Sequence, residues 1–177
     1  TERLSRLKTG DHVPCFGPLG HGFRIPSGNR RHLMVAGGIG VAPFYALGKA
    51  LRKKRKALLY GVATQGHFAC LPDFREACGR VETITDRKGY VTRLLEKELE
   101  DPAPVQLYAC GPTPMLQAVW TLALDRNLPC QLSLETPMAC GFGICKGCSF
   151  PKRSPEEGYT LTCKEGPVYE AGAIEFS

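Results

Sequence analysis

The sequence PMACGFGICKGC, residues 137–148, places three cysteines within nine residues, and fourteen residues separate the last of them from Cys163. Four residues separate Cys140 from Cys145, and two separate Cys145 from Cys148. This opening spacing is the plant-type pattern in which four thiolates hold a 2Fe–2S cluster. Three glycines lie between these cysteines: Gly141, Gly143 and Gly147. They allow a tight loop whose backbone amides turn toward the sulfurs. The stretch therefore predicts an iron–sulfur site.

A zinc site is the main competing interpretation of these cysteines. Structural zinc sites favour two C-x2-C knuckles, and here only Cys145 and Cys148 form one. A disulfide framework ranks lower, because a cytosolic chain keeps its thiols reduced. The cysteines without ligand-like spacing are interpreted as ordinary small, buried or half-buried side chains: Cys15, Cys70, Cys78 and Cys130.

Strands alternate with helices in the region before the cysteines. Apolar, β-branched runs predict five strands, at residues 32–36, 58–62, 81–85, 105–110 and 130–135. Apolar residues at helical spacing follow the first, third and fourth of them. This alternation predicts an α/β fold with a five-stranded, parallel, doubly wound sheet.

Two glycine-containing turns follow strands of this predicted sheet. One is GGIGVAP at residues 37–43, and the other begins with Cys110, Gly111 and Pro112. Parallel sheets bind ligands beyond the carboxyl ends of their strands, so both turns and the exit toward the cysteines fall at one edge. Together they predict nucleotide binding, with backbone amides at a helix start facing a pyrophosphate. The alternative is that the glycines serve only close helix–strand packing.

The chain divides into three parts. Residues 1–28 carry one β-like fragment at residues 11–16, too little to close a barrel. Residues 29–135 form the predicted α/β domain, and residues 136–177 the predicted cluster domain with short strands at 159–163 and 168–170. Because the chain starts at Thr1 without methionine, we expect a segment to precede it.

Composition excludes some functions. The chain has 177 residues with a net charge of +6, and no apolar run approaches the roughly 20 residues of a membrane span. With no signal peptide in evidence, a cytoplasmic protein is expected. The basic run of residues 52–56 is interpreted as a solvated helix end, and no aromatics interleave with it to suggest nucleic-acid binding. Asp86 and Lys88 are interpreted as turn residues, and the four histidines as structural.

These motifs, with GPLGHGF at residues 17–23, resemble the electron-transfer subunit of NAD-dependent dihydroorotate dehydrogenase, a branch of the ferredoxin reductase superfamily. The resemblance covers the whole chain, and the cysteine motif is its most specific part. It implies an N-terminal FAD-binding barrel, an NAD-binding domain and a C-terminal 2Fe–2S cluster. It also implies a catalytic partner subunit whose FMN receives electrons from dihydroorotate, in a heterotetramer of two subunits of each kind. From that FMN the electrons would pass through the cluster and FAD to NAD, in pyrimidine biosynthesis.

Carried over residue by residue, the resemblance assigns no catalytic residue to this chain. It gives the cluster to Cys140, Cys145, Cys148 and Cys163, and the NAD side to Gly38, Gly40, Cys110, Gly111 and Pro112. Thr1 resembles the end of the last flavin-contacting segment, so the chain is expected to hold only a remnant of the FAD barrel. The expectation is a truncated form of the subunit, or a subunit completed by another chain.

Two alternatives to this function remain open. Relatives in the superfamily serve as NAD(P)H reductase subunits of sulfur-, ferredoxin- or hydrogenase-linked complexes, and in some of them an aspartate is the first cluster ligand. Cys140 favours the dihydroorotate branch. The alternative from another class is a zinc-binding interaction module on a nucleotide-binding scaffold.

Overall fold

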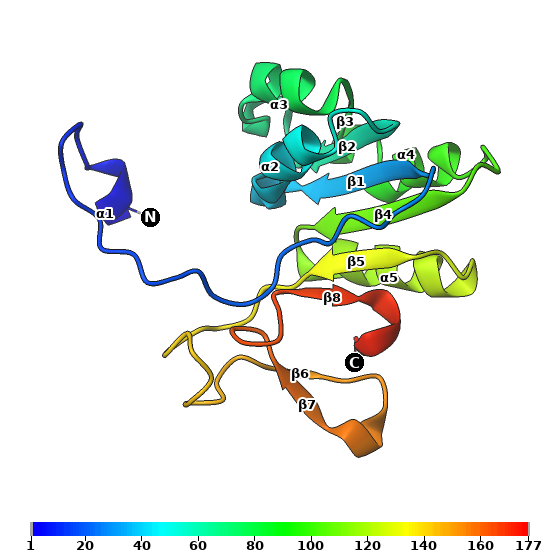
Figure 1. The fold of residues 1–177 in the computed structure, drawn as a ribbon. Coiled ribbons are helices and arrows are strands. Elements are labelled where there is room, and N and C mark those ends of the chain that lie inside the picture. The colour runs from blue at the N-terminus through cyan, green and yellow to red at the C-terminus, as the bar shows by residue number, and fades with distance from the viewer. Residues whose placement is uncertain (1, 177) are drawn as a thin grey trace.

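The computed structural model describes residues 2–176 and contains a six-stranded sheet in the order β3-β2-β1-β4-β5-β8 (Figure 1). The first five strands in this order are parallel to one another, and β8 is antiparallel to β5. The bounds are β1 Arg31–Gly37, β2 Lys56–Val62, β3 Arg80–Thr85, β4 Val105–Cys110, β5 Cys130–Ser133 and β8 Val168–Glu170. A separate two-stranded sheet pairs β6, Ser149–Pro151, with β7, Tyr159–Leu161.

Helices cover both faces of the large sheet. They are α2 Pro43–Ala50, α3 Leu71–Cys78, α4 Val91–Glu98 and α5 Thr113–Asp125, with a short α1, Glu2–Ser5, at the start of the described chain. Successive residues of a strand point to opposite faces. Leu33 and Val35 of β1 accordingly pack in the core under α4 and α5, whereas Met34 and Ala36 pack in the core under α2 and α3. The predicted doubly wound arrangement is confirmed.

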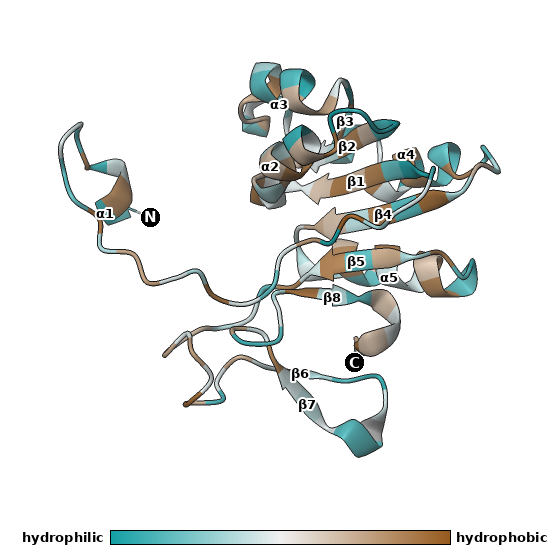
Figure 2. Cartoon of the chain, viewed as in Figure 1, coloured by the Kyte–Doolittle hydropathy of each residue, from teal (hydrophilic) through white to brown (hydrophobic). Residues whose placement is uncertain are grey.

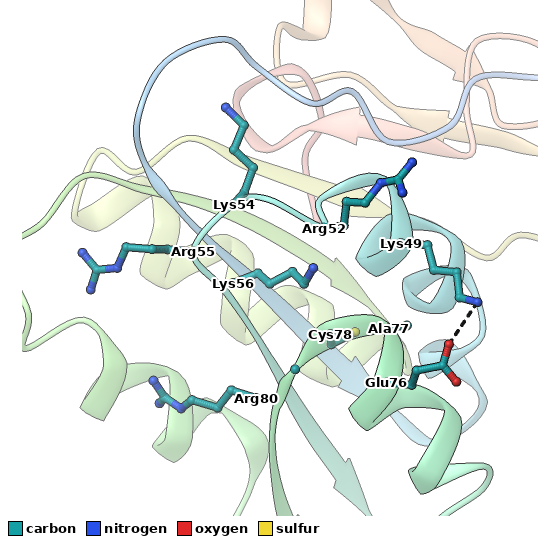
Figure 3. A pocket seen from close by; sticks show the side chains of 10 residues that line it. Lys49, Arg52, Lys54, Arg55, Lys56, Glu76, Ala77, Cys78 and Arg80 are labelled. Carbon is teal, nitrogen blue, oxygen red and sulfur yellow. Dashed lines mark ion pairs between the residues drawn. The ribbon is translucent and has the colours of Figure 1, made fainter.

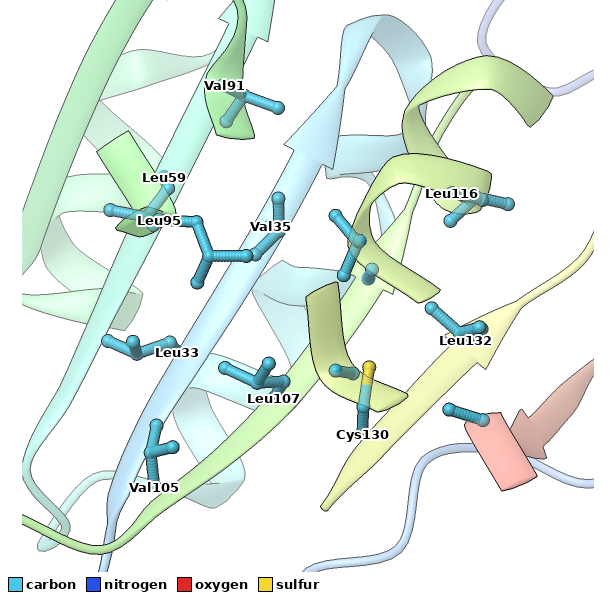
Figure 4. Packing of buried hydrophobic residues seen from close by; sticks show 14 of the residues in the cluster. Leu33, Val35, Leu59, Val91, Leu95, Val105, Leu107, Leu116, Cys130 and Leu132 are labelled. Carbon is cyan, nitrogen blue, oxygen red and sulfur yellow. The ribbon is translucent and has the colours of Figure 1, made fainter. Parts of the chain in front are cut away.

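The apolar contacts explain why β1 and β4 occupy the centre. All seven residues of β1 and all six of β4 are buried. Leucines of β1, β2 and β4 belong to one buried cluster with Leu95 of α4 and Leu116 of α5 (Figure 4). Each fully buried leucine contributes roughly 1.5–3 kcal/mol to folding. In Figure 2 the brown, apolar segments accordingly lie along the central strands, and teal segments at the loops and helix ends.

The sheet has one more strand than the sequence predicted. The strand at residues 168–170 was expected in the small C-terminal part, but as β8 it pairs with β5. Without it β5 would be an edge strand with unpaired backbone groups, so β8 protects that edge. A three-residue strand shows too little alternation to reveal its partner. The predictions also missed the short helix α3 and the strand β6.

The segment before β1 crosses the sheet without forming a strand. The β-like fragment at residues 11–16 is exposed and unpaired in the described structure. Further along, the backbone of Arg24 donates to Oε1 of Gln131 at 2.8 Å and accepts from its Nε2 at 3.1 Å. The ring of Phe23 stacks on Phe44 with centroids 5.5 Å apart. Residues 23–24 therefore attach this segment to the large sheet.

Among the helices between residues 2 and 176, none has the length and apolar character needed to cross a membrane.

Candidate functional site

The hairpin of β6 and β7 brings Cys163 next to Cys148, the last cysteine of the loop. Cys148 directly precedes β6, and Cys163 lies two residues after β7. Because Ser149 pairs with Leu161, the amide of Thr162 donates to the carbonyl of Cys148 at 3.1 Å. The fourteen-residue gap in the motif is thus the length of this hairpin.

The four thiols are arranged as two pairs. The amide of Cys145 donates to Sγ of Cys140 at 3.4 Å, and the amide of Cys163 donates to Sγ of Cys148 at 3.5 Å. Within residues 2–176, no three cysteine, histidine or carboxylate side chains converge as they would around a single metal ion. A 2Fe–2S cluster binds four thiolates on two irons, two to each iron, and the two pairs fit that requirement.

The loop backbone gives these sulfurs their electrostatic surroundings. Positive φ angles at Gly141 (79°) and Gly143 (91°) turn the loop back on itself. Hydrogen bonds from the amides of Cys145 and Phe142 lower the pKa of Cys140 to about 6. Amides that stabilise a thiolate also stabilise the negative sulfurs of a bound cluster.

The second pair of thiols lies deeper. Cys148 and Cys163 are buried, Cys140 is half-buried and Cys145 is exposed. The pKa of Cys163 is raised by its hydrogen bond with the Cys148 thiol and by loss of solvation. A group held by all four would therefore reach the surface on the Cys140–Cys145 side.

A cavity of about 820 Å³ opens at the carboxyl ends of β1, β2 and β3. Backbone and side-chain atoms of Gly37, Gly38, Ile39, Gly61 and Val62 form its sheet side. The start of α5 forms another wall through Pro112, Pro114, Met115 and Ala118. Its size and its place beyond the strand ends are those expected of a nucleotide site.

The predicted nucleotide residues divide into two groups. Gly38, with a φ of 55°, and Pro112 line the cavity. Gly40, Cys110 and Gly111 lie behind it, where the two turns contact each other. A Cβ at Gly40 would approach the carbonyl oxygen of Cys110 to 2.3 Å. Burial raises the pKa of the Cys110 thiol. Close packing is therefore the role that the structure shows for Gly40.

The sequence interpretation missed several polar residues of the cavity, among them Asp86 and Tyr90. Asp86 follows β3 and is exposed, as expected of a solvated turn residue, and it also lines the cavity. Tyr90, at the start of α4, lines the cavity and is 73% exposed. The position of Asp86 directly after a parallel strand was the available signal, because that position faces the ligand edge.

Replacing Gly40 by alanine is expected to destabilise the chain by about 1–3 kcal/mol, because the new methyl group meets backbone that cannot move away. Urea unfolding measures the loss. Gly66→Ala is the matched control, since nothing lies within 4 Å of a Cβ at that glycine. Equal stability of Gly40→Ala and the control would contradict the packing described above.

Comparisons with known proteins cover both sites. Residues 34–121 match the oxidoreductase NAD-binding domain family, and residues 135–175 match the iron–sulfur cluster binding domain of dihydroorotate dehydrogenase B. The solved structure of an NADH-dependent reduced ferredoxin-NADP oxidoreductase superimposes with a TM-score of 0.81 at 26% identity. That superposition covers 98% of this chain and 64% of the other.

Two curated relatives extend the match over nearly the whole chain. The dihydroorotate dehydrogenase B (NAD(+)) electron transfer subunit of Caldanaerobacter subterraneus is 37% identical over 99% of this chain and 71% of the relative. The probable subunit of the same name from Thermococcus kodakarensis is 38% identical over 96% of this chain and 70% of the relative. The chain therefore belongs to the family of electron-transfer subunits of NAD-dependent dihydroorotate dehydrogenase B, and is an oxidoreductase subunit.

Proposed function

We propose that the chain carries electrons between an FMN-containing dihydroorotate dehydrogenase catalytic subunit and NAD, through a 2Fe–2S cluster and FAD, in pyrimidine biosynthesis. The observation that carries this proposal is the presence, in one chain, of two cysteine pairs, each joined by a hydrogen bond from a backbone amide to a sulfur, and of a cavity at the nucleotide edge of the sheet. The family relationship supplies the identity of the partner and of the substrate.

In this proposal the four cysteines would hold the cluster as two pairs, Cys140 with Cys145 and Cys148 with Cys163. When bound, a 2Fe–2S cluster takes up and releases electrons one at a time. The contribution of the chain is to hold four thiolates in place and to direct amides at their sulfurs. The hairpin keeps the Cys148–Cys163 pair away from water, and the loop presents the other pair at the surface.

The nucleotide would bind in the cavity at the carboxyl ends of β1–β3. Its pyrophosphate would lie at the turn that begins with Gly38, and Pro112 would contact the ring end. Gly40, Cys110 and Gly111 would support these contacts by holding the two turns together. Asp86 would accept hydrogen bonds from ribose hydroxyls, and its charge would repel a 2′-phosphate, which favours NAD over NADP.

Asp86→Ser is expected to raise the affinity for NADPH about tenfold relative to NADH, because it removes the repulsion of the 2′-phosphate next to the cations Arg87 and Lys88. Titration of both nucleotides by fluorescence measures the ratio. Asp73→Ser, which removes an exposed carboxylate on α3 outside the cavity, should leave the ratio unchanged. An unchanged ratio in Asp86→Ser would remove Asp86 from the nucleotide site.

The partner subunit would dock beside the cysteine loop. Large apolar side chains are exposed there: Phe16, Leu19, Met138, Phe142 and Ile144. The rings of Phe16 and Phe142 lie 6.1 Å apart, edge to face, so the early segment and the loop share one surface. Exposed apolar groups of this kind are typical of protein–protein contacts. The proposed assembly is a heterotetramer of two subunits of each kind.

The chain would divide into three parts. Residues 1–28 would be a barrel remnant, 29–135 the NAD-binding domain and 136–177 the cluster domain. FAD would need barrel residues beyond this remnant, and its predicted contact at Thr1 lies outside the described residues. All nine cysteines are free thiols, which suits the reducing cytoplasm.

Mixing the anaerobic chain with its FMN-containing catalytic subunit and dihydroorotate tests the function. The expected result is bleaching of the iron–sulfur absorption in the visible spectrum, only when both subunits are present. The Cys148→Ala chain provides the blank. No bleaching with an active partner subunit would overturn the proposal. Bleaching by reduced ferredoxin instead would favour the ferredoxin-linked alternative, to which the 26% identical structure is related.

A further inference from the structure

A second hollow, of about 700 Å³, lies at the opposite edge of the large sheet from the nucleotide cavity (Figure 3). It is bounded by the last turns of α2 and α3 and by the first residues of β2 and β3. Ala77 and Cys78 belong to its buried part. Neither of the activities proposed above uses this region.

The lining of this hollow is strongly basic. Six cationic side chains and one carboxylate, Glu76, line it, and the cations are Lys49, Arg52, Lys54, Arg55, Lys56 and Arg80. Cations at a helix end usually compensate the helix dipole, which is equivalent to about half an elementary charge. The two helix ends here account for about one charge, so most of the positive charge needs another explanation.

Ion pairs account for only half of these cations. Lys49 pairs with Glu76 at 3.4 Å, Arg55 with Asp101 at 3.7 Å, and Arg80 with Glu82 and Glu98. In Figure 3, Arg55 and Arg80 extend to the side of the hollow away from Lys49 and Glu76. Among the residues that the structure describes, Arg52 and Lys56 have no ion-pair partner. Lys54 has none either, but its Nζ donates to the carbonyl of Gly28 at 3.1 Å.

Lys56 distinguishes this hollow from a solvated helix end. It begins β2, is half-buried, and in Figure 3 extends toward Lys49. Loss of solvation lowers its pKa. The interpretation of the whole run of residues 52–56 as a solvated helix end is therefore wrong for Lys56, although it fits Lys53, which is exposed and outside the hollow.

We propose that this hollow binds a small anion carrying two or more linked phosphate groups, with Arg52 and Lys56 as its unpaired cations. A concave site with cations on several elements surrounds a compact polyanion better than it fits the convex surface of an acidic protein. Arg52 can bind phosphate oxygens bidentately, and the lysines act as point charges. Free pyrophosphate and nucleoside diphosphates share this chemistry.

Isothermal titration of the purified chain with sodium pyrophosphate, at low salt, tests the proposal. The expected result is one saturable site that Arg52→Gln/Lys56→Gln weakens about tenfold or more, because each lost charged hydrogen bond is a large part of the binding free energy. Arg52→Gln alone, at an exposed position, should give a smaller loss and covers the case in which the double variant is unstable.

Lys53→Gln is the matched control, because it removes the same charge from the same run but outside the hollow. Equal weakening by Lys53→Gln and by the variants of Arg52 and Lys56, or no binding of pyrophosphate by the wild type, would overturn the proposal. Parallel titrations with ADP identify the source of the phosphate. If ADP binds more tightly than pyrophosphate and the variants of Arg52 and Lys56 weaken its binding, the ligand is a nucleotide. If these variants leave ADP binding unchanged, the ligand is free pyrophosphate. NADH affinity should stay unchanged in every variant, since its cavity lies at the other edge.

Discussion

Cys148→Ala is expected to lower the iron and acid-labile sulfide content of the chain to under about a tenth of the wild-type value, because the cluster loses one of its four ligands. Cys148 is 2% exposed and begins the hairpin, so no neighbouring group or water can easily replace its sulfur. Colorimetric iron and sulfide assays on anaerobically purified protein measure the effect.

The matched control for this prediction is Cys130→Ala. Cys130 is equally buried, at 2% exposure, but lies in β5 within the main apolar core. Its removal should slightly reduce stability and leave the iron content unchanged. Full iron content in Cys148→Ala would contradict the assignment of the ligands, whereas equal losses in both variants would show that iron binding depends only on general stability.

Ala118→Trp is expected to weaken NADH binding about tenfold or more. Ala118 lies on the exposed side of α5 and lines the cavity, so a tryptophan there occupies ligand space without entering the core. Unlike the glycine positions, Ala118 carries no close-packing role in the turns, so the fold should be kept. Quenching of NADH fluorescence on titration with protein measures the affinity.

Gln117→Trp provides the comparison, since Gln117 precedes Ala118 on the same helix and is exposed outside the cavity. It should bind NADH as the wild type does. If Ala118→Trp retained wild-type affinity while folded, the nucleotide would have to bind elsewhere.

The five parallel strands could be predicted because each contains apolar or β-branched residues and is bounded by turn residues. β1 is buried on both faces, and no polar side chain follows Arg31 and His32 at its start. The strand at residues 168–170 could be predicted, but its place in the large sheet as β8 could not. It has three residues, and its partner β5 lies some forty positions away in the sequence, so pairing depends on the tertiary fold.

In the candidate sites, too, local sequence patterns could be recognised, whereas features that depend on the tertiary fold could not. The spacing of the cysteine loop is a local property, and it predicts a cluster site at four cysteines, of which the hairpin brings Cys148 and Cys163 together. Glycines carry less information, because the same residue type lines the cavity at Gly38 and packs two turns together at Gly40. Tyr90 enters the cavity only through the arrangement of the strand ends, and no local pattern marks it, whereas Asp86 could have been found from its position directly after β3. The basic hollow likewise depends on elements that meet in space.

Anaerobic determination of bound metal and acid-labile sulfide in the wild-type chain tests the central claim most directly. We expect two irons and two sulfides per chain, with a visible absorption band that bleaches on reduction. Zinc in place of iron, or well-folded protein that binds no metal under reconstitution with iron and sulfide, would contradict it and favour a zinc-binding or purely structural role for the four cysteines.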